Sequence, residues 1–136
     1  QAWDKSDLFT FVYDTKAVYG SLEFLKKHIQ PEDIKRFVRT GAGNSYHMIL
    51  HNYLHTKSAG AIKDIFKHAR FVIQGKQFLK SEIFQSDLGE LILNTEELDR
   101  QVLSRFLEMQ QGFPVDLQHD TTLIFHWAKE TLQAMK

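Results

Sequence analysis

Apolar residues along this chain recur at the spacing of α-helices, with only short breaks between the repeats. The first pattern runs over 8–29, and its main apolar face is the stripe of a helix that packs on a core. A second and weaker apolar stripe lies opposite. Its members are Phe9, Tyr13, Ala17, Gly20 and Phe24. A helix that is apolar on two sides is either central in its fold or shared with a partner, so dimerisation through this stripe is one alternative.

The rest of the chain continues the helical pattern. In chain order, we predict a short helix over 31–41, a loop over 41–44, a long helix over 45–75, a linking stretch over 76–85, and helices over 87–111 and from 116 onward. No segment has the alternation of a strand. The predicted fold class is therefore all-α, an antiparallel four-helix bundle with one additional short helix. We expect a single domain over 1–136, and a start at Gln1 agrees with excision from a longer protein.

Composition narrows the function classes. The chain has 17 basic and 17 acidic residues, so no net field draws in nucleic acid or an anionic membrane. It has no cysteine, which excludes disulfides and thiolate chemistry and fits the cytoplasm. No apolar run approaches the length of about 20 residues that spans a bilayer. We find no phosphate loop or nucleophile elbow, so a free-standing small-molecule enzyme has little support.

The most informative segment holds three histidines with a spacing of four. On a continuous helix over 45–75, His47, His51 and His55 form one ridge that faces the bundle interior or its rim. Buried imidazoles need hydrogen-bond partners. Asp99 falls on the apolar stripe of a later helix, and a carboxylate there is unusual unless it is paired. The alternative is that Asp99 lies only at the helix-packing rim and is solvated. A satisfied polar layer between helices is the simplest interpretation.

A metal or haem site is a second interpretation of the same residues. Histidines four apart on a helix can bind one metal ion together, and Asp99 could be a further ligand or orient one. The ligand set would then be His47, His51, His55 and Asp99. No other metal-ligand pattern accompanies it. His119 and His126, in contrast, fall opposite the apolar stripe of the last helix and are predicted to be exposed.

The third interpretation comes from a resemblance. The run from His55 through Thr56, Lys57, Ser58, Ala59 and Gly60 resembles the phosphoacceptor motif of histidine phosphotransfer (HPt) domains, including the N-terminal domain of chemotaxis histidine kinases. The family motif reads approximately His-Thr-Leu-Lys-Ser/Gly-Ala. In this chain the lysine follows the histidine by two residues instead of three, which on a helix turns it by about 100°. Lys57 would then point away from His55, unless the helix carries a π-bulge or breaks near Gly60.

The resemblance implies a four-helix bundle that works as a signalling module. His55 would accept and donate a phosphoryl group, assisted by Lys57 and Ser58, and the partner would be a response-regulator receiver or a kinase domain. No cofactor is implied. The alternative from another class is a helical sensing or interaction domain, dimeric in one version, whose histidines form a structural or ligand-binding layer.

Overall fold

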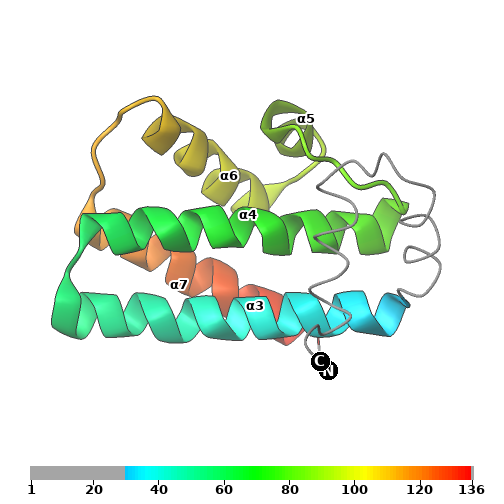
Figure 1. Cartoon of the computed structure of the whole chain (residues 1–136), viewed down its shortest axis with the longest axis horizontal. Helices are drawn as coiled ribbons and strands as arrows, with labels where there is room; N and C mark the ends of the chain where they lie inside the picture. The colour runs from blue at the N-terminus through cyan, green and yellow to red at the C-terminus, as the bar shows by residue number, and fades with distance from the viewer. Residues whose placement is uncertain (1–29, 136) are drawn as a thin grey trace, which may run out of the picture.

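The computed structural model describes residues 30–135, and these are almost entirely helical (Figure 1). The helices are α3 (Pro31–His51), the π-helix η1 (Asn52–Thr56), α4 (Ala59–Ser81), α5 (Leu88–Leu93), α6 (Glu97–Gln110) and α7 (Leu117–Ala134). No strand occurs in this range. The prediction of an all-α fold is confirmed, and within residues 30–135 four long helices are accompanied by one short α-helix.

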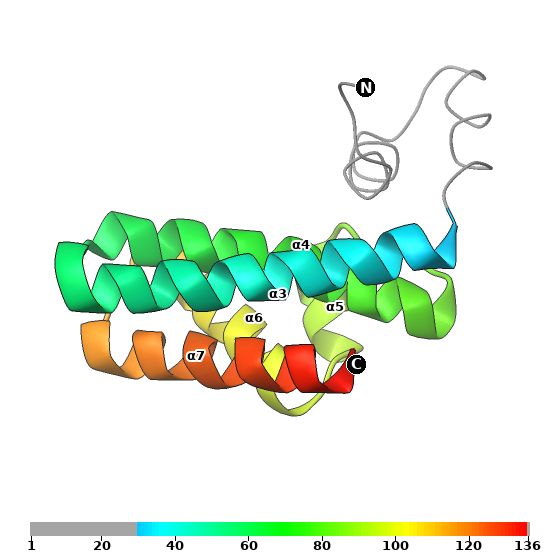
Figure 2. The same ribbon diagram turned by 90° about the horizontal axis from the view of Figure 1, so that it is seen from below.

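The four long helices form an up-and-down bundle. α3 packs against α4 and α7, and α6 packs against α4 and α7, so each neighbouring pair is antiparallel (Figures 1 and 2). The α3–α4 turn and the α6–α7 loop lie at the same end of the bundle. One core lies between the helices. Its largest fully buried side chains include Trp127, Phe66, Ile49, Ile62, Ile73, Leu91, Leu103 and Ile124. No helix within residues 30–135 is both long and apolar enough to cross a membrane.

The helices that form the bundle are not the ones predicted. The segment 8–29, with its Phe9–Phe24 stripe, lies outside the described residues. The predicted short helix over 31–41 is the first half of α3, which continues to His51. The prediction that Gly41 ends this helix is wrong. A Cβ built on Gly41 would lie 2.4 Å from Val72 Cγ2, so this glycine allows α3 and α4 to approach closely in mid-helix.

The other helix boundaries are partly as predicted. The linking stretch begins later, because α4 runs to Ser81. The predicted helix over 87–111 is divided into α5 and α6 by a break around Thr95, which is buried. Two start sites are confirmed, since Asp87 caps α5 and Asp116 caps α7 through their carboxylates. His119 and His126 are exposed, as the pattern predicts.

Candidate functional site

The histidine segment forms a helical hairpin turn instead of a long helix. α3 ends at His51 and passes into η1. Lys57 then adopts a left-handed conformation, with φ of 52°, and its N–H donates to the Asn52 carbonyl at 2.5 Å. Ser58 is extended, and its Oγ accepts a hydrogen bond from Ala61 N at 3.1 Å to cap α4. The prediction of one continuous helix over 45–75 is therefore wrong.

Asn52 holds this turn together from inside. Its side-chain Oδ1 accepts a hydrogen bond from Ser58 N at 3.0 Å, and its Nδ2 donates to Ser58 O at 3.2 Å. The residue is only 3% exposed. Because a buried amide must satisfy both of its polar ends, this pairing fixes the angle at which α4 leaves α3. The side chain of Asn52 therefore determines the conformation of the turn that joins α3 to α4.

The histidine ridge faces solvent, and the prediction that it faces the bundle interior is wrong. The buried face of α3 ends with Ile49 and continues with Asn52 in η1. His47 and His51 each lie two residues from Ile49, which places them about 200° around the helix from it. His55 is exposed on η1. The rings of His51 and His55 are 4.9 Å apart, tilted by 46°. A buried histidine layer does not form here, because the hairpin turn breaks the register that would have aligned the ridge with the core stripe of α4.

The two residues expected to assist His55 are engaged elsewhere in the turn. Lys57 Nζ donates to the Tyr53 carbonyl at 3.0 Å and lies 5.8 Å from the centre of the Tyr53 ring. The Ser58 hydroxyl oxygen is the cap of α4. The structure thus places His55, Lys57 and Ser58 in one turn, but it gives the lysine and the serine structural contacts of their own.

A shallow groove between α3 and α4 adjoins the turn. Its volume is about 580 Å³, and both His47 and His51 line it together with His68 from α4. Burial lowers the pKa of His68, and the neighbouring Gly41 backbone opposes this effect only in part. Burial therefore holds His68 toward the neutral form.

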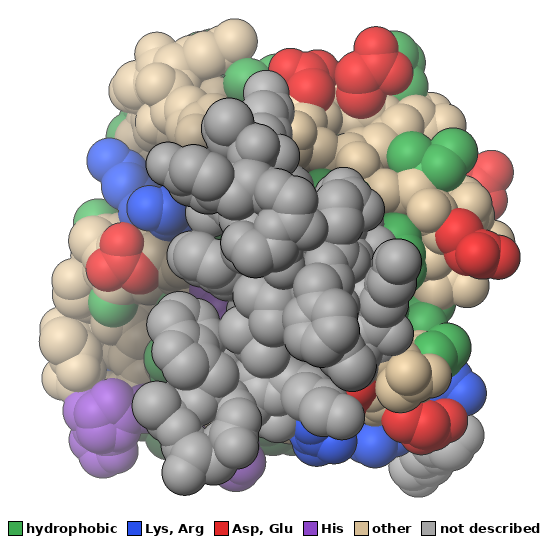
Figure 3. Space-filling view, turned by 45° about the vertical axis from the view of Figure 1, so that its right-hand side comes forward, with side chains coloured by type: hydrophobic (Ala, Val, Ile, Leu, Met, Phe, Trp, Pro, Cys, Tyr) green, Lys and Arg blue, Asp and Glu red, His purple; other side chains and the backbone are tan. Residues whose placement is uncertain are grey.

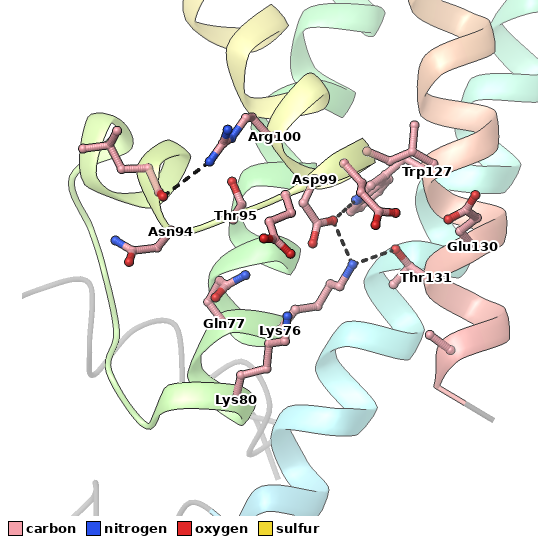
Figure 4. A pocket seen from close by; sticks show the side chains of 15 residues that line it. Lys76, Gln77, Lys80, Asn94, Thr95, Asp99, Arg100, Trp127, Glu130 and Thr131 are labelled. Atoms are coloured by element: carbon pink, nitrogen blue, oxygen red, sulfur yellow. Dashed lines mark hydrogen bonds and ion pairs between the residues drawn. The ribbon is translucent and has the colours of Figure 1, made fainter.

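Asp99 belongs to a different cluster from the histidines. Its Oδ1 accepts hydrogen bonds from Lys76 Nζ and from Trp127 Nε1, both at 2.8 Å (Figure 4). Lys76 Nζ also donates to the Thr131 hydroxyl at 3.4 Å. Asp99 is thus paired, but with a lysine and a tryptophan and not with the histidines of the expected polar layer. Nowhere in residues 30–135 do three histidine or carboxylate side chains form a group that could hold a metal ion.

The Asp99 cluster joins three helices at the floor of a polar pocket of about 470 Å³. Lys76 comes from α4, Asp99 from α6, and Trp127 and Thr131 from α7. Both members of the ion pair are mostly buried, with 23% of the lysine side chain and 15% of the aspartate side chain exposed. Such a pair costs stability when one partner is removed, so it fixes the register of α4, α6 and α7.

A second buried ion pair secures the α6–α7 loop. Asp120 is fully buried and receives two hydrogen bonds from the Arg105 guanidinium, at 2.8 and 3.0 Å. Burial by itself would raise the pKa of Asp120, but hydrogen bonds from Arg105, from the His119 ring and from the Asp116 backbone lower it overall. Arg105 also donates to the Pro114 carbonyl, so the pair holds the loop against both helices.

Charge is divided between two layers of the bundle. Residues 31–81, which form α3 and α4, carry nine Lys or Arg against three Asp or Glu, a net charge of +6. Residues 82–135 carry three against ten, a net charge of −7. In Figure 3, histidines gather at the lower left corner and acidic side chains lie mainly along the upper and right-hand edges. The overall balance conceals this division, which a count by segment would have found.

The segment 34–63, which leads into the turn and out of it, has no acidic residue and five basic ones, of which Lys57 lies in the turn. Apolar side chains are exposed in the same region, and Leu54 is the most exposed of them at 64%, with Met48 at 42% and Tyr53 at 39%. A surface of this kind, with apolar groups among positive charges, is typical of a binding site for another macromolecule.

Comparison of the chain with family models, with curated proteins and with solved structures finds no match. The resemblance to HPt domains consequently stays a prediction from the sequence.

Proposed function

We propose that this chain is a helical protein-interaction domain that docks on an acidic protein surface through its α3–α4 hairpin. The observation that supports it best is the run of 30 residues, 34–63, without a carboxylate in a chain whose charges balance overall. That run includes most of α3 and the whole turn. Opposite charge steers partners together and fixes their orientation, so the partner should present carboxylates.

A protein partner agrees better with this surface than a nucleic acid does. Phosphate backbones are bound by free Lys and Arg side chains. Here Arg39 donates to the Met135 carbonyl at 3.4 Å and Arg36 pairs with Asp33 at 3.1 Å. The charge that a partner meets near the tip is therefore that of Lys57 and Lys63, a small patch instead of the extended row that a phosphate backbone requires. Leu54 and Tyr53 add exposed apolar area at the tip. An apolar centre with a charged rim is the usual composition of a protein–protein interface.

The proposal can be tested with a defined acidic probe. A labelled synthetic peptide of repeated Glu-Glu-Leu-Glu units should bind the full chain in a fluorescence anisotropy titration, and added salt should weaken the complex. The double variant Lys57→Glu, Lys63→Glu should bind several-fold more weakly. Lys129→Glu, which changes an exposed lysine of α7 in the acidic layer, is the matched control and should bind as the wild type does.

Three results would contradict the proposal. One is an absence of peptide binding at low salt, and another is an equal loss of binding in the Lys129→Glu control. The third is clearly tighter binding of a duplex DNA that carries the same number of negative charges, since this would indicate a nucleic-acid surface instead.

A second candidate function is phosphoryl transfer through His55, as the resemblance implies. The observation that favours it is the exposure of His55, because an acceptor must be reachable by its partner. Ala59 and Gly60 beside it are small and exposed, which leaves room for a receiver domain. The imidazole nitrogen would attack the aspartyl phosphate, forming an N–P bond while the O–P bond to the carboxylate breaks. Charge balance by Lys57 requires this amine to leave the Tyr53 carbonyl.

Labelling distinguishes this second candidate from the first. Under phosphoryl transfer, a phosphorylated receiver with Mg²⁺, or phosphoramidate as a chemical donor, labels the wild type at His55. His55→Gln should abolish the label, whereas His126→Gln, which changes an exposed histidine of α7, should leave it intact. No label in the wild type with either donor would reject phosphoryl transfer and leave the docking proposal unaffected.

A further inference from the structure

Four of the six large apolar side chains that are exposed in the described residues lie at or near one end of the bundle. Met48, Tyr53 and Leu54 come from the α3–α4 hairpin, and Phe113, 52% exposed, comes from the α6–α7 loop. Both connections are at the same end (Figures 1 and 2). Exposed apolar side chains that cluster in this way indicate an interface.

The two connections are complementary in shape. Leu54 projects from the hairpin with 64% of its surface exposed. The α6–α7 loop contains a hollow of about 540 Å³, whose apolar lining consists of Phe113, Pro114 and Val115. A leucine side chain on one molecule and an apolar hollow on another can bury each other, at about 25 cal/mol for each Å² removed from water.

The two connections are also complementary in charge. The tip of the hairpin carries Lys57 beside exposed imidazoles, and residues 34–63 contain no carboxylate, the next one being Asp64. The α6–α7 hollow is bordered by Glu108, Asp116 and the exposed His119, and its one arginine, Arg105, is paired with both Glu108 and the buried Asp120. The hollow therefore keeps an excess of negative charge, which faces the positive charge of a hairpin that enters it.

We infer that two copies of this chain form a two-fold symmetric dimer through this end of the bundle. In such a dimer the hairpin of each copy enters the α6–α7 hollow of the other. A two-fold interface uses the same patch twice, so a projection and its matching hollow must lie on one face of the molecule, as they do here. The inference rests on the proposed function, because it uses the same hairpin, and it names a second copy of the chain as an acidic partner. The contact surface at one end of a bundle is small, so the dimer should be weak and reversible.

Sedimentation velocity over a range of concentrations tests this dimer on the full chain. The wild type should pass from monomer to dimer as its concentration rises toward the submillimolar range. Leu54→Arg and Phe113→Glu should each weaken dimerisation at least about tenfold, because each change disrupts both contacts of the symmetric interface. Leu93→Glu changes a leucine that is 72% exposed on α5 and should have no effect.

A mixture of the two variants supplies a second readout. A heterodimer of the Leu54→Arg chain with the Phe113→Glu chain keeps one of the two native contacts and gains an ion pair at the other. The mixture should therefore associate more tightly than either variant does alone. Both substituted side chains are exposed in the wild type, so circular dichroism should show that both variants remain folded.

The inference is overturned if the wild type stays monomeric, if Leu93→Glu weakens the dimer as strongly as the other variants, or if the mixture does not associate. The acidic-peptide titration separates the two proposals. A monomeric chain that still binds the peptide rejects the dimer and keeps the docking function, and a chain that does neither rejects both.

Discussion

Replacing Asn52 by alanine removes both side-chain hydrogen bonds that hold the α3–α4 turn. Ser58 O keeps a second partner, since Ile62 N donates to it at 3.3 Å, but Ser58 N loses its acceptor. A polar group left unpaired in a largely buried position costs about 1–3 kcal/mol. The substitution also leaves a small void, because Asn52 is 3% exposed. We therefore expect Asn52→Ala to lower the free energy of unfolding by about 2 kcal/mol.

Urea titration followed by circular dichroism measures this change directly, and a thermal melt should show a midpoint lower by roughly 6–10 °C for a chain of this size. Asn44→Ala is the matched control, since Asn44 is exposed on the same helix and alanine is the better helix former. It should leave the stability unchanged or raise it slightly. A loss below about 0.5 kcal/mol in Asn52→Ala, or an equal loss in the control, would refute the assignment of Asn52 as the residue that fixes the turn.

Further predictions concern the contact between α3 and α4 and the dependence of stability on pH. Gly41→Ala should destabilise the protein by about 2 kcal/mol, because the added methyl group clashes with Val72. A methyl group added at Gly43 meets no atom within 4 Å, so Gly43→Ala should stabilise the protein by about 1 kcal/mol. Equal thermal midpoints for the two variants would contradict this. Because the pKa of His68 is lowered, its contribution to stability is complete above its ordinary pKa of 6.5 and declines as the pH falls below that value. In urea titrations, the free energy of unfolding of His68→Gln should therefore fall less steeply with decreasing pH than that of the wild type. The pKa of Asp120 is also lowered, so its contribution is complete above the ordinary carboxyl range and is lost on acidification. Asp120→Asn should cost about 3 kcal/mol at neutral pH and flatten the acid limb of the stability curve, and an unchanged acid limb would count against this assignment.

Periodicity predicted the fold class, and it predicted two helix starts that side chains cap, although it missed the start of α4 that Ser58 caps. Asp87 and Asp116 cap the two predicted starts, and the sequence itself supplies the capping oxygen. The prediction that Gly41 ends a helix was wrong because of a tertiary contact. A glycine that permits close contact between helices has the same sequence signal as one that ends a helix. The turn at Lys57 gave only an indirect signal, because the two-residue spacing from His55 left a π-bulge or a break near Gly60 open without deciding between them and a continuous helix.

The candidate sites, too, could be predicted from the sequence only in part. That Asp99 must be paired could be predicted from its place on an apolar face, but its partners Lys76 and Trp127 come from helices whose relative register only the fold provides. The orientation of the histidines depended on a single assumption, the continuity of the helix through residues 55–60. Once the turn breaks that helix, the orientation inferred from the helical wheel reverses. The charge division between the two layers was available from the sequence, but a count over the whole chain averages it away.

Both functional proposals depend on the histidine segment being an exposed hairpin tip, and a distance between two spin labels tests this most directly. The chain has no cysteine, so cysteines introduced at the exposed positions Asn44 and Lys67 would be the only labelling sites. In the hairpin the two positions lie on adjacent antiparallel helices, whose axes are about 8–10 Å apart, so pulsed electron paramagnetic resonance should give a label distance of roughly 20 Å or less. One continuous helix would separate the two positions by about 35 Å, and that result would contradict the account.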